Sequence, residues 1–181
     1  MAYESLSQIF DEMDEIHARF DERTSALGPE DLSARPDEAS WSVVEIVEHV
    51  SMVEKSILKL IKMLLMKAEA AGVAANEDGS IGPVSVEAIV ERSLREKYNA
   101  PETALPSGNV SVKDSLERMR AVRENLEELR PRLAKMNLSQ ASYPHPAFGP
   151  MNVYEWLILI GIHKDRHLRQ IEAIISEPVG Q

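Results

Sequence analysis

The sequence predicts an all-α protein, a four-helix bundle with up-down-down-up order. Four long segments repeat apolar residues at three- and four-residue spacing, which is the period of a helix with one buried face. No segment alternates apolar and polar residues convincingly, and 8 glycines and 10 prolines in 181 residues are few for a loop-rich β fold. The length fits a single domain, which we place over residues 1–181.

The first two helices are predicted over residues 3–27 and 42–72. Gly28-Pro29 ends the first helix. The second begins with an S-x-x-E capping box, in which Ser42 and Glu45 satisfy free backbone groups of the first turn. Its broad apolar face runs as far as Leu65. A short turn at residues 30–32 is expected in the connection.

The other two helices are predicted over residues 111–136 and 152–176. Ser111 caps the third helix, and Pro131 predicts a kink or an early stop near its end. Asn152 and Glu155 resemble a second capping pair at the start of the fourth helix. Residues 156–160 of that helix are apolar all round, which indicates a deeply buried segment.

The connection between the second and third helices is the longest, covering residues 73–110. We expect a short helix at about residues 86–95 within it. A connection of this length can cross the whole bundle, so the second and third helices can run parallel. Its position suggests either a lid or a contact between two copies of the chain.

Composition removes several classes of function. The chain has no cysteine, which excludes disulfide frameworks, thiolate metal sites and cysteine nucleophiles. A net charge of −10 makes binding to nucleic acid a poor expectation. The longest uncharged apolar run is far shorter than the roughly 20 residues of a membrane span. With no visible signal peptide, we expect a cytoplasmic protein that does not bind membranes.

Three of the five histidines suggest a metal site. His163 and His167 are four residues apart, so both imidazoles project from one face of the fourth helix. His49 lies about 10 Å into the second helix, and His167 about 12 Å from the end of the fourth. If the second and fourth helices are antiparallel, His49 and His167 lie at the same height along the bundle. Three histidine ligands with an open position are the usual pattern of a catalytic metal site.

The alternatives are less specific. Histidines on apolar helices can simply be core residues that are hydrogen-bonded to a carbonyl or a carboxylate. We interpret His17 as a residue at the edge of the core and His145 as part of a Pro-rich turn, although either could complete a closed, structural site. Gln170 shares a face with His167, and it either orients that ring or contacts the substrate, or it lies on the surface. Phosphate-loop, dinucleotide, zinc-protease and serine-hydrolase motifs are absent.

The segments around these histidines resemble a known family. Residues 41–50 contain W-S-x-x-E-x-x-x-H, residues 145–156 contain H-P-x-F-G-x-x-x-x-x-E-W, and residues 163–171 contain H-x-x-R-H-x-x-Q-I. Together with the four-helix layout, these motifs resemble the DinB-like superfamily over nearly the whole chain. The connection at about residues 73–110 is longer than is usual in that family.

The resemblance implies a divalent metal held by His49, His163 and His167, with zinc or nickel as the expected ion. It also implies kinship with transferases and isomerases that act with bacillithiol or mycothiol, and it makes a homodimer an expectation. We therefore expect a small-molecule substrate and thiol-transfer chemistry. A metal-dependent hydrolase is the close alternative, and a non-catalytic helical protein with a structural metal or histidine cluster is the other.

Overall fold

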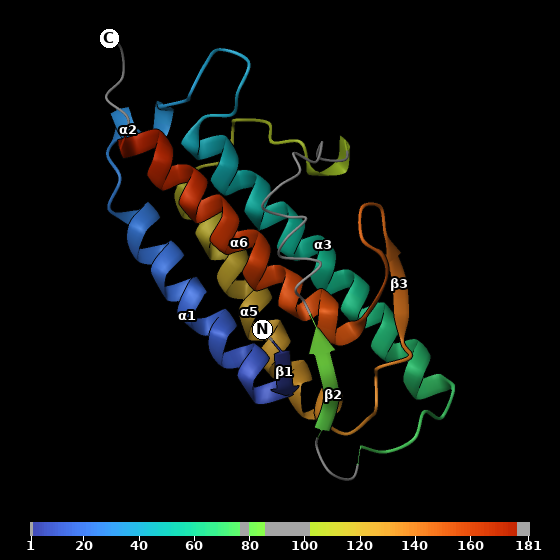
Figure 1. Ribbon diagram of the computed structural model, residues 1–181. Helices are drawn as coiled ribbons and strands as arrows, with labels where there is room; N and C mark the ends of the chain where they lie inside the picture. Colours follow the sequence, from blue (N-terminus) through green and yellow to red (C-terminus); the bar gives the residue numbers. More distant parts are fainter. Residues whose placement is uncertain (1, 77–79, 86–101, 177–181) are drawn as a thin grey trace.

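The computed structural model describes residues 2–76, 80–85 and 102–176, and four long helices dominate it (Figure 1). The helices pack side by side, which confirms the predicted all-α four-helix bundle. A short helix, α2, follows the first, and a 3-10 turn, η1, precedes the third. The bounds are α1 Leu6–Ser25, α2 Pro29–Ser33, α3 Val43–Ala70, η1 Glu102–Ala104, α5 Val112–Ala134 and α6 Val153–Ser176.

Side-chain pairs between helices show the direction of each helix. Lys62 of α3 donates to Asn125 of α5 at 2.6 Å, and Arg132 of α5 pairs with Glu69 of α3, also at 2.6 Å. Residue numbers rise together along both helices, so α3 and α5 run parallel. The chain must therefore return along the bundle between them, as the length of the connection predicts.

The first and third long helices run in opposite directions. Arg120 of α5 pairs with Asp21 near the end of α1, whereas Arg130 donates to Ser7 near its beginning. His49 of α3 contacts His167 of α6, whereas Glu54, further along α3, contacts the earlier Lys164, so α6 runs antiparallel to α3. The order is therefore up-down-down-up. Figure 1 shows this arrangement, with α1 and α6 next to each other.

Two short pairs of strands accompany the helices, although no segment of the sequence shows a convincing strand pattern. β1 (Ala2–Ser5) pairs antiparallel with β2 (Ser80–Ser85), and β3 (Ser142–His145) pairs antiparallel with β4 (Gly149–Asn152). Strands of four to six residues are too short to show a clear alternation of apolar and polar residues. The first helix consequently begins three residues later than predicted, because residues 3–5 belong to β1.

Capping side chains set the helix starts. Ser5 accepts the backbone N–H of Gln8 at 3.3 Å and starts α1 at the next residue. The predicted capping interactions at Ser42, Ser111 and Asn152 are all present. The helices begin one residue after each cap, since a cap residue is itself non-helical.

The ends and the short elements differ slightly from the prediction. α3 ends at Ala70 rather than 72, and Gly72 follows with a φ of +65°, a conformation that favours glycine. α5 continues past Pro131 to Ala134, so an early stop at that proline is wrong. The turn expected at residues 30–32 is part of α2, and the helix expected at 86–95 lies outside the described residues.

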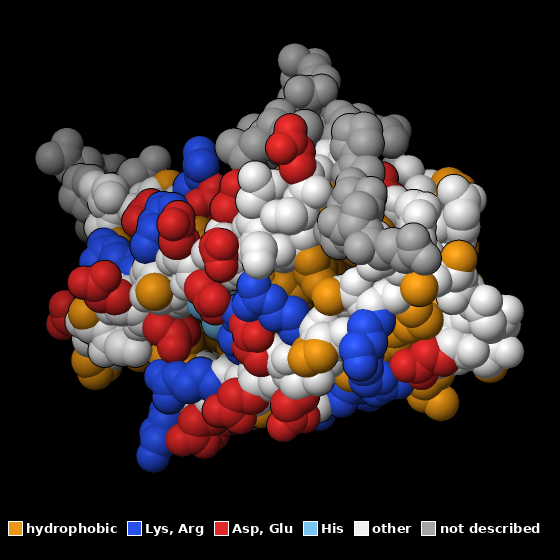
Figure 2. Space-filling view, turned by 90° about the horizontal axis from the view of Figure 1, so that it is seen from below, with side chains coloured by type: hydrophobic (Ala, Val, Ile, Leu, Met, Phe, Trp, Pro, Cys, Tyr) orange, Lys and Arg blue, Asp and Glu red, His pale blue; other side chains and the backbone are white. Residues whose placement is uncertain are grey.

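The buried apolar side chains form two clusters, one at each end of the bundle. Along α3, Glu54 falls between Val50 of one cluster and Ile57 of the other, and both apolar residues are buried. Figure 2 shows acidic and basic side chains intermixed over the surface at the end that carries β1 and β2. None of the described helices is long and apolar enough to cross a membrane.

Candidate metal centre

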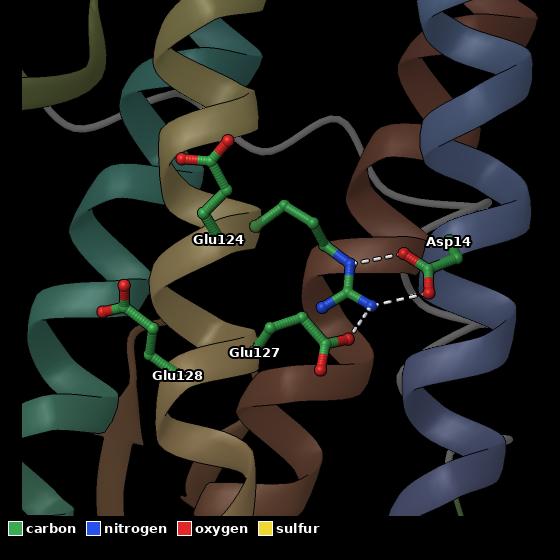
Figure 3. Close-up of a pocket in the computed structure, with 5 residues that line it drawn as sticks. Asp14, Glu124, Glu127 and Glu128 are labelled. Carbon is green, nitrogen blue, oxygen red and sulfur yellow. Dashed lines mark hydrogen bonds and ion pairs between the residues drawn. The ribbon is translucent and has the colours of Figure 1, made fainter.

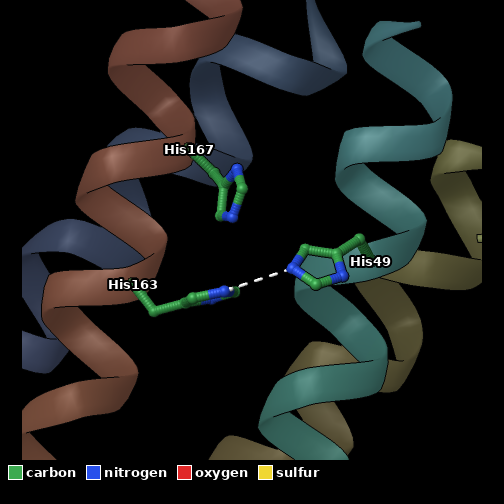
Figure 4. A group of neighbouring side chains, drawn as sticks. All are labelled: His49, His163 and His167. Carbon is green, nitrogen blue, oxygen red and sulfur yellow. Dashed lines mark hydrogen bonds between the residues drawn. The ribbon is translucent and has the colours of Figure 1, made fainter. Parts of the chain in front are cut away.

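Three histidines from two antiparallel helices point toward one another (Figure 4). His49 comes from the first third of α3, and His163 and His167 come from the middle of α6. Their ring centroids are 4.5–5.1 Å apart, and one nitrogen from each ring can be chosen so that all three lie within 4.8 Å of one another. The structure thus brings together the three side chains that the spacing and the resemblance single out.

Hydrogen bonds determine which nitrogen of two rings carries the proton. The Nδ1 of His49 lies 2.8 Å from the carbonyl oxygen of Ala104, and the Nδ1 of His167 lies 2.9 Å from the Oε1 of Gln170. Both oxygens can only accept, so each Nδ1 is the donor of a neutral ring. The Nε2 atoms of His49 and His167 therefore keep their lone pairs, which is the form that ligates metals.

The electrostatic environment keeps all three rings neutral. Burial is the main cause and lowers the pKa of His49, of His163 and, to about 3, of His167. The rings of His167 and His49 lower the pKa of His163 further, and the ring of His49 lowers that of His167. The charge of Arg166 also lowers the pKa of all three. Rings that resist protonation stay available as ligands at neutral pH.

The donor set fits a divalent ion. The Nε2 atoms of His49 and His163 are 3.2 Å apart. Two nitrogens bound tetrahedrally to zinc at about 2.0–2.1 Å are separated by about 3.4 Å. The Nδ1 of His163 is buried and has no hydrogen-bond partner, so this ring lacks the outer contact that its two neighbours have. Among the residues that the structure describes, the group contains no fourth histidine or carboxylate.

Of Glu45, Glu155, His145 and Gln170, all but one serve the local backbone structure. Glu45 accepts from Ser42 at 2.7 Å, and Glu155 accepts from Asn152 at 2.7 Å, so both are capping residues. His145 accepts backbone N–H groups within the β3–β4 hairpin and stacks on Phe148. The exception is Gln170, which contacts His167 directly.

A buried polar triad next to the cluster was not predicted. Lys164 Nζ lies 2.8 Å from the Oε1 of Glu54 and 2.7 Å from the Nδ1 of His17. Lys164 and Glu54 each occupy a position where the helical period calls for an apolar residue, four residues after Ile160 and Val50 respectively. Two opposite charges that interrupt facing apolar stripes are the signal that could have identified the pair.

Two further neighbours of the cluster come from outside the helices. The ring of Trp41, which precedes α3, lies 4.8 Å from the ring of His49. Residues 104–108, which precede α5, contact both His49 and Glu48. Neither contact has a periodic signature, because both depend on how the connections fold back onto the bundle.

A surface pocket of about 480 Å³ lies elsewhere, where α1 meets α5 (Figure 3). Four carboxylates line it together with Arg123, whose guanidinium pairs with Asp14 and Glu127. Arg123, the basic residue of the pocket lining, is already engaged in those two ion pairs. The exposed acidic side chains alone do not indicate which ligand the pocket would bind. The histidine cluster is therefore the stronger candidate site.

Comparison with known proteins gives the same picture. A family model described as the DinB superfamily matches residues 12–171. A crystal structure titled "TT2238, a four-helix bundle protein" aligns with a TM-score of 0.58 and 21% identity, covering 92% of this chain and 98% of that one. At this identity the similarity shows the fold alone.

Two relatives are similar over most of their length. The "Uncharacterized protein YuaE" of Bacillus subtilis is 25% identical over 150 residues, which is 82% of this chain and 85% of that protein. A protein of Oceanobacillus iheyensis named "Putative metal-dependent hydrolase OB0413" is 24% identical over 162 residues, or 90% of this chain and 80% of that protein.

Proposed function

This chain belongs to the DinB superfamily, and from that premise we propose that it is a metal-dependent enzyme whose ion is held by His49, His163 and His167. One observation carries the proposal. Three neutral imidazoles converge from α3 and α6, and hydrogen bonds leave the Nε2 lone pairs of His49 and His167 free.

The ligands and their neighbours have separate tasks. His49, His163 and His167 bind the ion, and Ala104 and Gln170 hold two of the rings in the correct tautomer. A divalent ion in such a site supplies Lewis acidity, because it lowers the pKa of a thiol or a water molecule that it binds. Three neutral ligands leave the positive charge of the ion uncompensated, and three protein ligands leave a position for a substrate.

The substrate we propose is a small molecule, and the attacking group is a low-molecular-weight thiol. This part of the proposal rests on the resemblance to thiol-dependent transferases. The thiol sulfur would form a new bond to an electrophilic carbon while the leaving group departs with its electron pair. The thiol proton passes to solvent, because no side chain of the cluster is a free base once it binds the ion.

Hydrolysis is the second candidate, and one observation favours it. The relative from Oceanobacillus iheyensis carries the name of a metal-dependent hydrolase. The same three ligands would serve this reaction, with water in place of the thiol. The two candidates differ only in the nucleophile, so a single set of electrophilic substrates can separate them.

The first test is elemental analysis of protein purified without an immobilised-metal column. About one zinc, nickel, iron or manganese ion per chain supports the proposal and identifies the ion for assays. Electrophilic esters and alkyl halides are then supplied with and without cysteine or another small thiol. Product that requires both the ion and the thiol indicates transfer, and product without thiol indicates hydrolysis.

A structural metal site predicts a different result. Chelation would lower the melting temperature, and no substrate would be consumed under either condition. A folded protein that contains no metal and takes up neither zinc nor nickel would contradict the proposal altogether.

A further inference from the structure

A buried carboxylate lies next to the first histidine. Glu48 precedes His49 on α3, and its side chain is buried, with the whole residue only 3% exposed. A buried carboxylate is costly unless hydrogen bonds replace the water that it has lost. Glu48 receives three such bonds, and all three come from residues 107 and 108, just before α5.

The geometry of these bonds resembles a clamp. One oxygen, Oε2, accepts the backbone N–H groups of Ser107 at 3.1 Å and of Gly108 at 2.9 Å. The other, Oε1, accepts the hydroxyl of Ser107 at 2.9 Å. Hydrogen bonds to an ionised carboxylate are among the stronger ones in proteins. Glu48 therefore attaches the end of the long connection to α3.

The same short segment also contacts the metal-binding cluster. Ala104 is buried three residues before Ser107, and its carbonyl oxygen is the partner of the Nδ1 of His49. Glu48 and His49 are thus consecutive on α3, and both bind residues 104–108. The contact that orients His49 is made by Ala104, and the contacts that hold the segment are made by residues 107 and 108. The two sets of contacts are therefore neighbours both on α3 and in the segment before α5.

Glycine at position 108 permits this approach. Gly108 has a φ of +72°, in the left-handed region that other residues avoid. A Cβ atom there would lie 3.5 Å from the Oε1 of Glu45, in ordinary contact, so space is not the constraint. The backbone conformation is the constraint, and it turns the N–H of Gly108 toward Glu48.

We propose that Glu48 is a positioning residue for the metal centre: it fastens residues 104–108 against α3, so that the Ala104 carbonyl holds His49 ready to bind the ion. The inference rests on the proposed function of the histidines. Without the clamp, the His49 ring would sample other orientations and its other tautomer. The cost of ordering the His49 ring would then make metal binding less favourable. Partners of ligating histidines typically change metal affinity by about 10- to 100-fold.

The test compares Glu48→Ala with Glu48→Gln in the full chain. In the Gln variant the amide oxygen can accept both N–H groups, and the amide nitrogen can donate to the Ser107 hydroxyl, so the clamp survives. The Ala variant loses all three bonds. Zinc affinity is measured by competition with a chromophoric chelator, and hydrogen exchange of the peptide containing residues 104–108 is measured in metal-free protein.

We expect Glu48→Ala to bind zinc about tenfold more weakly and to exchange the 107 and 108 amides faster, with Glu48→Gln close to wild type on both measures. Gly108→Val is the second variant, and it changes the other side of the same contact. Because Gly108 is exposed, we expect this variant to fold even if Glu48→Ala does not. The strained φ of +72° should release the same amides and weaken zinc binding in the same direction.

The outcomes separate the two proposals. If wild-type protein binds zinc and the Glu48→Ala and Gly108→Val variants bind it equally well, the role of Glu48 is wrong while the metal site stands. Unchanged amide exchange in both variants also overturns that role. If wild-type protein binds no zinc, the proposed function fails and the coupling fails with it, whatever the exchange shows.

Discussion

Lys164 and Glu54 form a buried ion pair between α6 and α3, with their charged atoms 2.8 Å apart and side-chain exposures of 0% and 1%. Burial raises the pKa of Glu54, and the nearby Lys164 opposes that change. Burial likewise lowers the pKa of Lys164, opposed by Glu54. Lys164 directly follows His163 in the chain, so the pair fixes the stretch of α6 that carries two of the three histidines.

Removing one partner of this pair should be strongly destabilising. We expect Lys164→Met to lower the free energy of unfolding by about 3–5 kcal/mol, because Glu54 would remain buried without its cation. The double variant Lys164→Met with Glu54→Leu should recover most of this loss, since no uncompensated charge is left. Urea unfolding of the four proteins of this cycle measures the coupling. Equal stability of the single variant and wild type would contradict the prediction.

Stability of the metal-free protein should fall with acid. Burial, and then the charge of Lys164, lower the pKa of His17 from 6.5 to about 3. The unfolded chain therefore binds a proton at His17 below about pH 6.5, whereas the folded chain does not. The contribution of His17 to the free energy of unfolding is therefore fully present above this pH. It is lost as the pH falls toward 3, by up to about 1.4 kcal/mol per pH unit.

The variant His17→Gln isolates that contribution. Its amide can still accept from Lys164, but it does not titrate. Urea midpoints measured from pH 7 to pH 4 should show a shallower slope for the variant than for wild type. Parallel slopes would show that His17 is protonated in the folded protein as readily as in the unfolded one.

The three histidines should each be required for stoichiometric metal. His163→Ala, purified without a nickel column, should retain less than a tenth of the wild-type metal, because two remaining imidazoles hold a divalent ion weakly. His145→Ala is the matched control, since His145 lies in the β3–β4 hairpin and contacts Phe148 and Trp156 instead. Full metal content in His163→Ala would refute the assignment of the site.

Gln170 should tune the affinity of the site without holding the ion. Its side chain lies on the exposed face of α6 and accepts from the Nδ1 of His167 at 2.9 Å. We expect Gln170→Ala to weaken zinc binding about tenfold, and Gln170→Glu to restore it, because a carboxylate accepts the same bond more strongly. Arg169→Ala, one residue away and paired with Asp165, serves as the control and should leave the affinity unchanged.

The sequence was sufficient for the helices and for the cluster because both depend on local periodicity. Apolar spacing placed α1, α3, α5 and α6, and the four-residue spacing of His163 and His167 placed both rings on one face of α6. The length of the crossover then allowed α3 and α6 to be antiparallel, which brought His49 level with His167. Each step uses only the geometry of a helix and the direction of a connection.

What could not be predicted depends on contacts between distant segments. β1 forms only because residues 80–85, which are distant from it in the sequence, pair with it. The clamp at Glu48 depends on where residues 107 and 108 come to lie, and a buried glutamate looks the same in sequence as one on a solvated face. Lys164 and Glu54 carry a local signal, but charged residues on a helix are ordinarily assigned to its surface.

The order in which the chain is synthesised has a consequence for when the centre can assemble. His49 emerges with the second of the four long helices, but His163 and His167 both belong to the last. A nascent chain that lacks α6 holds only one of the three proposed metal ligands, and α1 lacks the helix against which it packs most extensively. The proposed three-histidine site would therefore be complete only after translation of all four helices, so metal occupancy would mark a fully synthesised bundle.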